Sequence, residues 1–128
     1  MEIKLYSQTD EARLFVMVRD EGGGWECLLD EKHIEKYRHA LAKSLTYVAY
    51  DGDEMCGYVR CRDDDGLGVY VYDLLVKSTY RGHSIGKMLI GKVCADHPRE
   101  TVYVMSDVDG YYEKLGYRKI GSIFEIHA

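Results

Sequence analysis

A glycine-containing turn over residues 80–87 is the part of this sequence best suited to hold a charged ligand. It follows an apolar run, Val69 to Val76, and opens a segment, Ile85 to Asp96, with the apolar spacing of a helix. A strand that feeds such a turn at a helix start leaves backbone N–H groups unpaired. Those donors and the positive end of the helix dipole attract an anion, and Arg81 and Lys87 add positive charge. The pattern predicts a site for a phosphate-bearing cofactor.

Two widespread phosphate-binding loops do not fit this turn. A Walker loop has four residues between its glycines and a Ser or Thr after its Lys. Here three residues separate Gly82 from Gly86, and Met88 follows Lys87. The dinucleotide fingerprint G-x-G-x-x-G is also absent.

The turn resembles the Arg/Gln-x-x-Gly/Ala-x-Gly/Ala signature of the GNAT N-acetyltransferase superfamily, read here as Arg81-x-x-Ser84-x-Gly86. Ser84 departs from the family's usual Gly or Ala but keeps the position small. A second stretch, Gly110 to Tyr117, is similar to the aromatic-Tyr-Glu-Lys-Leu-Gly-aromatic box of the same superfamily. The two motifs stand in the family's order, and together the resemblance covers roughly residues 67–126.

Helical and strand patterns alternate along the chain in the order expected of that superfamily. Glycines and Asp-Gly turns separate the segments, and no linker or internal repeat divides them, so we expect one domain over residues 1–128. The expected strands are 2–6, 45–50, 55–62, 67–76, 101–105 and 117–126. The first expected helix follows cap residues 7–10 and ends at the glycines 22–24, and the second is capped by Asp30 and carries Ile34, Tyr37 and Leu41 on one side. Two more helices are expected over 85–96 and 109–115. The fold class is α/β (an α+β mixed sheet). The resemblance implies a mostly antiparallel sheet, splayed between its fourth and fifth strands and flanked by about four helices.

The resemblance also implies that acetyl-CoA is the cosubstrate. The turn would hold its pyrophosphate through residues 81–87, namely Arg81, Gly82, His83, Ser84, Ile85, Gly86 and Lys87. In the family, backbone groups of the preceding strand bind the pantetheine arm, and these map here to Leu75 and Val76. The Val76 N–H would also donate to the thioester oxygen. His83 could be taken for a base, but we expect its side chain to face solvent or the phosphates.

Tyr112, the Tyr of the second box, is the residue that the resemblance makes the general acid for the departing thiolate. A phenol suits this role because its ordinary pKa, near 10, keeps it protonated at neutral pH. The alternative is that Tyr112 only packs among neighbouring rings, which is the role we expect for Tyr111.

The general base is less sharply defined by the sequence. Asp73 is an acid within an otherwise apolar strand and is the first candidate for accepting the amine proton. It could equally be an edge-facing or salt-bridged aspartate. Asp107 and Asp109 follow the fifth expected strand and are rivals, and water could serve instead.

The acceptor is expected to be a small primary amine, with a peptide or protein amine as the second possibility. Trp25 could supply an aromatic wall, and Glu26, Asp73 and Asp107 a negative one, which suits an organic cation. Two other functions stay open at this stage. One is a non-catalytic module that senses acetyl-CoA, and the other is a nucleotide-binding regulator, which the missing Lys-Ser pair disfavours.

Composition excludes several classes of partner. The formal net charge of −5 disfavours a nucleic-acid backbone. No apolar run reaches the roughly 18 residues of a membrane span, and the N-terminus does not resemble a signal peptide, so we expect a cytoplasmic protein without membrane partners. The closing strand, 117–126, could join a homodimer.

The four cysteines do not form a paired C-x-x-C framework, and we expect no metal site. Cys56 and Cys61 with a histidine could be imagined as zinc ligands. Their five-residue offset along one strand is expected to place them on opposite faces of the sheet.

Overall fold

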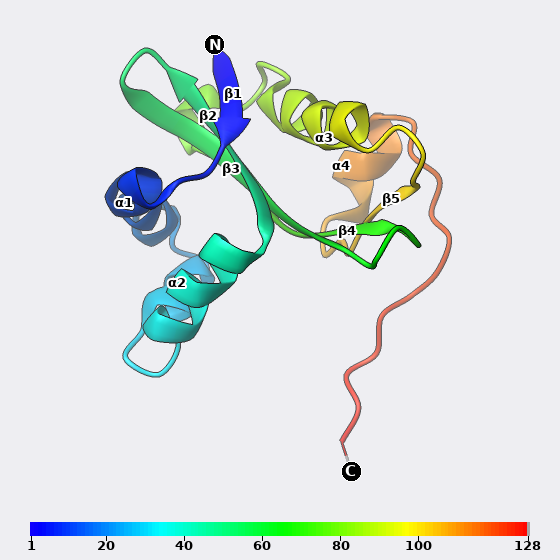
Figure 1. Cartoon of the computed structure of the whole chain (residues 1–128), viewed down its shortest axis with the longest axis horizontal. Helices are drawn as coiled ribbons and strands as arrows, with labels where there is room; N and C mark the ends of the chain where they lie inside the picture. The colour runs from blue at the N-terminus through cyan, green and yellow to red at the C-terminus, as the bar shows by residue number, and fades with distance from the viewer. Residues whose placement is uncertain (128) are drawn as a thin grey trace.

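The computed structural model describes residues 1–127 as a single curved sheet with helices on both faces (Figure 1). Five strands follow one another across the sheet in chain order. Neighbours are antiparallel except β4 and β5, which are parallel, so the predicted mixed sheet is confirmed. The strands are β1 (Glu2–Leu5), β2 (Leu45–Asp51), β3 (Glu54–Asp63), β4 (Val69–Val76) and β5 (Val102–Val104).

Four α-helices cover the sheet, as predicted. They are α1 (Glu11–Glu21), α2 (Ile34–Lys43), α3 (Ile85–Asp96) and α4 (Asp109–Lys114), with short 3-10 turns at Gln8–Asp10, Trp25–Leu29 and Ser78–Tyr80. One buried cluster joins α1 and α2 to one face of the sheet, and a second joins α3 to the other. Figure 1 shows α1 and α2 on one side of the strands, with α3 and α4 on the other.

The start of α1 is fixed by Asp10, which is almost fully buried. Its carboxylate accepts the Ser7 N–H at 2.8 Å and the Tyr50 hydroxyl at 2.6 Å. The carboxylate thereby satisfies a free donor at the helix start and ties the helix to the sheet. Gly22, at a φ of 65°, ends α1 in a conformation that glycine adopts readily.

The sheet opens between β4 and β5. Residues 69–71 of β4 pair with residues 102–104 of β5, and the pairing stops there. Residues 72–76 of β4 therefore have no strand partner on that side within the described chain. This is the predicted splay, and it leaves a free backbone edge leading into the glycine turn.

Two irregularities in strand register decide which side chains face which layer. Between β3 and β4, Arg60 pairs with Asp73 and Cys61 with Val71, so Tyr72 is left over as a bulge. Such a bulge reverses the facing of the residues that follow it. Val71 accordingly packs with the α3 cluster, whereas Leu75 packs with the α1–α2 cluster.

A second bulge corrects the prediction for the cysteines. Ala49 pairs with Gly57 and Tyr50 with Met55, which leaves Cys56 over. Cys56 and Cys61 therefore belong to the same buried cluster on the α3 face, not to opposite faces. Burial raises the pKa of both thiols, in keeping with small buried side chains.

The predicted closing strand over 117–126 is wrong. Residues 117–127 form no helix or strand, are exposed, and lie outside the sheet. The Tyr117 N–H donates to the Tyr112 carbonyl at 3.2 Å, and Lys119 Nζ pairs with Asp109 Oδ2 at 3.1 Å. These contacts hold the first residues of the segment against α4, and the rest runs away from the body (Figure 1). The apolar pattern is local, whereas a strand needs a neighbour with which to pair.

Within residues 1–127, no helix is long and apolar enough to span a membrane.

Candidate active site

The turn between β4 and α3 presents free backbone N–H groups. Its path depends on left-handed residues, Gly82 at a φ of 85° and Ser84 at 62°. The helix begins at Ile85, and the Met88 N–H donates to the Ser84 carbonyl at 3.0 Å as its first turn closes. The N–H groups of residues 85–87 precede that bond and have no acceptor within the helix. The free N–H groups expected at this helix start are therefore present.

The side chains of the turn divide by burial. Gly82, His83, Ser84 and Lys87 are exposed and surround the free N–H groups. Ile85 is 2% exposed and packs in the core with α3, so it can offer a ligand only its backbone.

Arg81 braces the turn in this structure. Its Nε donates to the Val76 carbonyl at 3.1 Å, and its Nη2 pairs with Glu21 at 2.5 Å. The guanidinium therefore joins the end of β4 to the end of α1. Its positive charge stays beside the turn but is partly balanced by Glu21.

The free edge of β4 presents the backbone of Val76, not that of Leu75. The Lys77 N–H donates to the Cys56 carbonyl at 2.8 Å, so Val76 and its partner Gly57 form a pair that exchanges no hydrogen bonds. The Val76 N–H consequently points away from β3, into the splay. Leu75 pairs with Tyr58, and its backbone faces β3, whereas Leu74 faces the splay as Val76 does.

Helix α4 meets α3 and β4 at Gly86. A Cβ placed on Gly86 would lie 2.2 Å from the Tyr111 hydroxyl and 3.7 Å from Leu74 Cδ2. The glycine is therefore needed for this close approach. Tyr111 packs as expected, and its contact places the second motif next to the first turn of α3.

Tyr112 lies in a group of three rings. Its ring meets Tyr111 edge-on, with centroids 5.0 Å apart, and stacks with Tyr117 at 6.4 Å. Burial raises the pKa of Tyr112 to about 12, and the neighbouring Tyr111, Asp107 and Tyr117 add to the shift in that order. The hydroxyl therefore stays protonated at any physiological pH, which is the state that a general acid requires.

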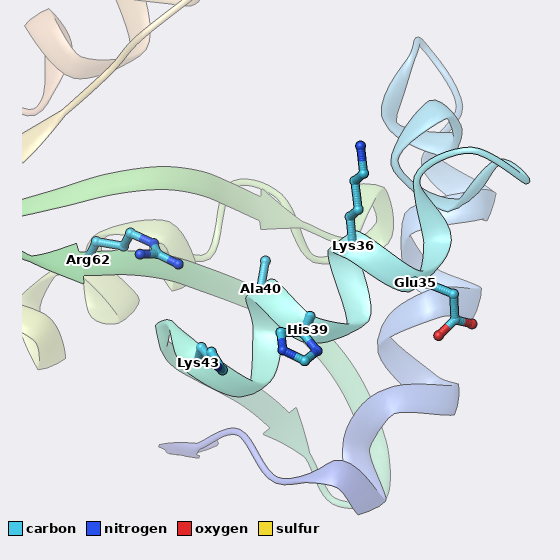
Figure 2. A pocket seen from close by; sticks show the side chains of 6 residues that line it. All are labelled: Glu35, Lys36, His39, Ala40, Lys43 and Arg62. Atoms are coloured by element: carbon cyan, nitrogen blue, oxygen red, sulfur yellow. The ribbon is translucent and has the colours of Figure 1, made fainter.

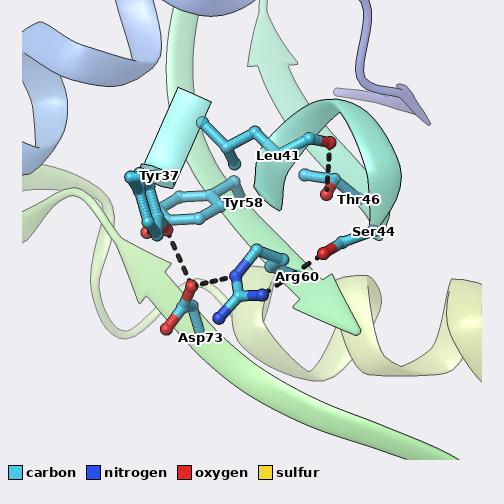
Figure 3. A network of polar contacts seen from close by, with 7 residues as sticks. All are labelled: Tyr37, Leu41, Ser44, Thr46, Tyr58, Arg60 and Asp73. Carbon is cyan, nitrogen blue, oxygen red and sulfur yellow. Dashed lines mark hydrogen bonds and ion pairs between the residues drawn. The ribbon is translucent and has the colours of Figure 1, made fainter. Parts of the chain in front are cut away.

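Asp73 belongs to a polar network beneath α2 (Figure 3). Its Oδ2 accepts the Tyr37 hydroxyl at 2.7 Å and Arg60 Nε at 2.5 Å. The Tyr37 and Tyr58 hydroxyls lie 2.6 Å apart, and Arg60 also donates to Ser44 Oγ at 3.2 Å. Asp73 is thus salt-bridged, the alternative that the sequence left open, and its second oxygen, Oδ1, points away from these bonds in Figure 3.

The network keeps both phenols protonated. Burial raises the pKa of Tyr37 and of Tyr58, and the carboxylate of Asp73 adds to both shifts. The Arg60 guanidinium lies over the rings of Tyr37 and Tyr72, at 5.6 and 5.5 Å. The result is a fixed carboxylate surrounded by aromatic rings.

Trp25 extends this aromatic surface. Its ring meets that of Tyr58 edge-on at 6.4 Å, and it packs against the α1–α2 cluster. Glu26 is exposed and accepts the Gly24 N–H at 3.0 Å within its own loop. The predicted aromatic wall therefore adjoins the Asp73 network, whereas Glu26 belongs to the loop.

Sequence reasoning missed Tyr37, Tyr58 and Arg60 as parts of the site. Tyr37 was expected only as an apolar residue of α2, and the other two were not distinguished along β3. Their meeting depends on the bulge at Tyr72, which turns Asp73 toward α2. Arg60, in the apolar middle of one expected strand, and Asp73, the one acid in the next, were the signal available.

A groove on the outer side of α2 lies apart from these residues (Figure 2). It contains none of the residues predicted for the site. Its charged lining is mostly basic, which does not suit a cationic amine. The lining residues are Glu35, Lys36, His39, Ala40, Lys43 and Arg62.

Comparison with known proteins identifies related chains. The profile of the acetyltransferase (GNAT) domain family matches residues 42–119. The uncharacterized N-acetyltransferase ycf52 of Pyropia yezoensis is 22% identical over 99 residues, which is 70% of this chain. This chain spans 57% of the length of that relative.

Solved structures show the same fold. A GNAT-family acetyltransferase of Streptococcus pneumoniae TIGR4 superposes with a TM-score of 0.72 at 23% identity, covering 99% of this chain and 98% of the other. An aminoglycoside 6'-N-acetyltransferase complexed with coenzyme A gives a TM-score of 0.76 at 18% identity, covering 94% and 87%.

Proposed function

Because this chain belongs to the GNAT acetyltransferase family, we propose that it moves an acetyl group from acetyl-CoA to the primary amine of a small cationic molecule. The observation that carries the proposal is that free backbone donors lie at both ends of one connection, the Val76 N–H in the splay and the N–H groups of residues 85–87 at the start of α3. In no other place does the described sheet open onto a helix N-terminus.

Acetyl-CoA fits the chemistry of these donors. The N–H groups of residues 85–87 and the exposed Lys87 suit a diphosphate. The backbones of Leu74 and Val76 face the splay and can pair with the amide groups of pantetheine as a neighbouring strand would. When bound, acetyl-CoA supplies a thioester whose carbonyl the amine attacks directly.

The residues around the splay take separate roles in this proposal. The Val76 N–H donates to the oxygen that gains negative charge during attack. As the carbon–sulfur bond breaks, the Tyr112 hydroxyl gives its proton to the departing sulfur, and the proton that the acylated nitrogen loses restores the phenol.

A carboxylate accepts the proton that the ammonium group loses before attack. Asp73 is the proposed acceptor through Oδ1, because Arg60 and Tyr37 use Oδ2. The bonds to Oδ2 hold the carboxylate in place, and Trp25 and Tyr58 line its surroundings. Asp107, whose charge acts on Tyr112, is the competing proton acceptor.

The acceptor class follows from the same group of residues. Arg60 pairs with Oδ2 of Asp73 and lies over Tyr37 and Tyr72, so Oδ1 of Asp73 and the ring of Trp25 are the groups left to attract an ammonium group. The basic groove on the outer side of α2 would instead repel it. We therefore favour small organic cations over acidic acceptors.

The proposal is tested by measuring the free CoA thiol that is released when the protein is mixed with acetyl-CoA and an amine. The panel of amines contains primary alkylamines, aminoglycosides, amino acids and a lysine peptide. Thiol release with a cationic small amine, and an acetylated product of matching mass, would support it. Release only with the peptide would move the acceptor to protein amines. Tight acetyl-CoA binding without release for any amine would instead indicate a sensor.

A further inference from the structure

We propose that Asp63, His97 and Glu100 form a binding site for a zinc ion at the start of β4, the end of that strand away from the glycine turn. One ligand atom from each residue, a carboxylate oxygen or an imidazole nitrogen, lies within 4.8 Å of the other two. Imidazole nitrogen and carboxylate oxygen are both ligands that zinc accepts. The site contains none of the residues proposed for acetyl transfer, so it does not depend on that function.

Strand pairing brings the two carboxylates together. Asp63 is the last residue of β3 and pairs with Val69 of β4. On its other side Val69 pairs with Val102 of β5, and its N–H donates to the Thr101 carbonyl at 2.9 Å. This pairing fixes Glu100, the residue before Thr101, near the Asp63 side chain. These residues are far apart along the chain, which is why the sequence predicts no metal site here.

The end of α3 supplies the imidazole. His97 follows the last residue of α3, and the Glu100 N–H donates to the His97 carbonyl at 3.2 Å, which closes a tight turn. His97 Nδ1 lies 3.0 Å from the Val93 carbonyl, and a carbonyl only accepts, so Nδ1 carries a proton. In the neutral imidazole the lone pair is then on Nε2. A backbone carbonyl that holds the other nitrogen in this way is typical of histidines that bind metals.

The carboxylates lack a positive partner. Asp63 Oδ1 accepts the Gly66 N–H at 3.0 Å within its own hairpin. Glu100 Oε1 is buried and has no hydrogen-bond partner, and no other side-chain oxygen or nitrogen within residues 1–127 is left in this state. The neighbouring cation on β3, Arg62, lines the groove along α2 instead (Figure 2). A buried carboxylate oxygen without a donor is costly, and a bound cation would satisfy it.

The ligand set favours zinc over calcium and magnesium. Those harder cations take oxygen ligands, whereas zinc binds imidazole as well as carboxylate. Two carboxylates and a neutral imidazole carry the charge that one Zn²⁺ cancels. Asp63 is exposed, so water can complete the coordination. The bound ion would fasten the loop before β5 to the end of β3, which reinforces a strand of only three residues.

Calorimetric titration of the untagged, EDTA-treated full chain with zinc chloride is the first test. We expect a single zinc ion per chain. The melting temperature should rise by on the order of 5–10 °C when free zinc is about 100-fold above Kd. Absence of zinc binding would overturn the proposal.

Glu100→Gln separates a lost ligand from a damaged fold. Zinc binding should weaken by at least about tenfold, because even residues behind the ligands contribute that much. Without zinc the variant should melt no lower than the wild type, since it removes a repulsion between two carboxylates. The matched control is His33→Gln, because His33 lies 2.7 Å from Asp30 and is an exposed pair that could also attract zinc. Binding that survives in Glu100→Gln, or that is lost in His33→Gln, would contradict the assignment.

NMR shifts of the imidazole nitrogens identify the ligand atom without any substitution. Zinc should shift Nε2 of His97 and leave its Nδ1 protonated. Calcium chloride added alone should shift neither nitrogen. Zinc-dependent shifts confined to the other histidines, or calcium that binds as tightly as zinc, would refute the site.

Discussion

Replacing Tyr112 with Phe isolates the hydroxyl that we propose as the proton donor. The ring of the variant keeps its contacts with Tyr111 at 5.0 Å and with Tyr117 at 6.4 Å. α4 should therefore keep its place, and acetyl-CoA should bind as in the wild type. Only the proton for the departing sulfur is lost.

The size of the effect follows from the protonation state of Tyr112. With a pKa of about 12, only about one Tyr112 in ten thousand is ionised at pH 8, so nearly every molecule can donate. A positioned general acid contributes about 10²- to 10⁴-fold. The variant should lose that factor in kcat, which corresponds to about 3–5 kcal/mol of transition-state stabilisation. The wild type should show no loss of rate from Tyr112 ionisation up to about pH 10.

Initial rates of thiol release over pH 6–10 measure this loss, with Tyr111→Phe as the matched control. The Tyr111 hydroxyl lies against Gly86 and packs there, so its loss should cost less than about tenfold. If Tyr112→Phe turned over at the wild-type rate, or if both variants lost rate equally, Tyr112 would have no role as the acid.

Further substitutions test the remaining parts of the account. Asp73→Asn should lower kcat/KM for an alkylamine by about 100-fold, and should lower it much less for an amine that is uncharged at the assay pH. A larger loss for Asp107→Asn would show that Asp107, not Asp73, accepts the proton. Ser84→Gly should raise the free energy of unfolding by up to about 1 kcal/mol, because Ser84 has a left-handed φ of 62° that glycine adopts without strain. A lower free energy of unfolding in urea titration would contradict this. The Tyr47 hydroxyl donates to Asp96 at 2.5 Å and lowers the pKa of that carboxyl. The hydrogen bond therefore stabilises the folded state above about pH 4, and this stabilisation is lost as the pH falls through the lowered pKa. Tyr47→Phe should therefore be less stable at pH 7 and lose less stability on acidification to pH 2, and an unchanged pH profile by denaturant titration would contradict this.

The cofactor half of the fold was predictable because its signals are local. A turn that needs left-handed residues at Gly82 and Ser84, followed by a helix with regular apolar spacing, can be recognised from a short stretch of sequence. The second motif is equally local, since α4 and its exit at Gly116 depend on neighbouring residues.

The rest depended on register, which short patterns do not determine. The bulge at Tyr72 turns Asp73 toward Tyr37. The bulge at Cys56 puts this cysteine on the same face of the sheet as Cys61. A bulge of one residue reverses every later side chain of a strand, and the sequence carries no distinct mark for it. The segment 117–126 failed for a different reason, since its pattern is that of a strand but it pairs with no strand of the sheet.

The central claim is that the turn before α3 and the free edge of β4 bind acetyl-CoA. NMR chemical shifts of the backbone amides, recorded during titration with ligand, test it most directly. With coenzyme A, the largest shifts should fall on the amides of residues 82–87 and of Val76. Adenosine 3',5'-bisphosphate lacks the pantetheine arm and should shift only the amides of the turn. Pantetheine should shift only the amides of Leu74 and Val76. Coenzyme A that binds while the turn amides stay unmoved, or that shifts the groove along α2 instead, would contradict the account.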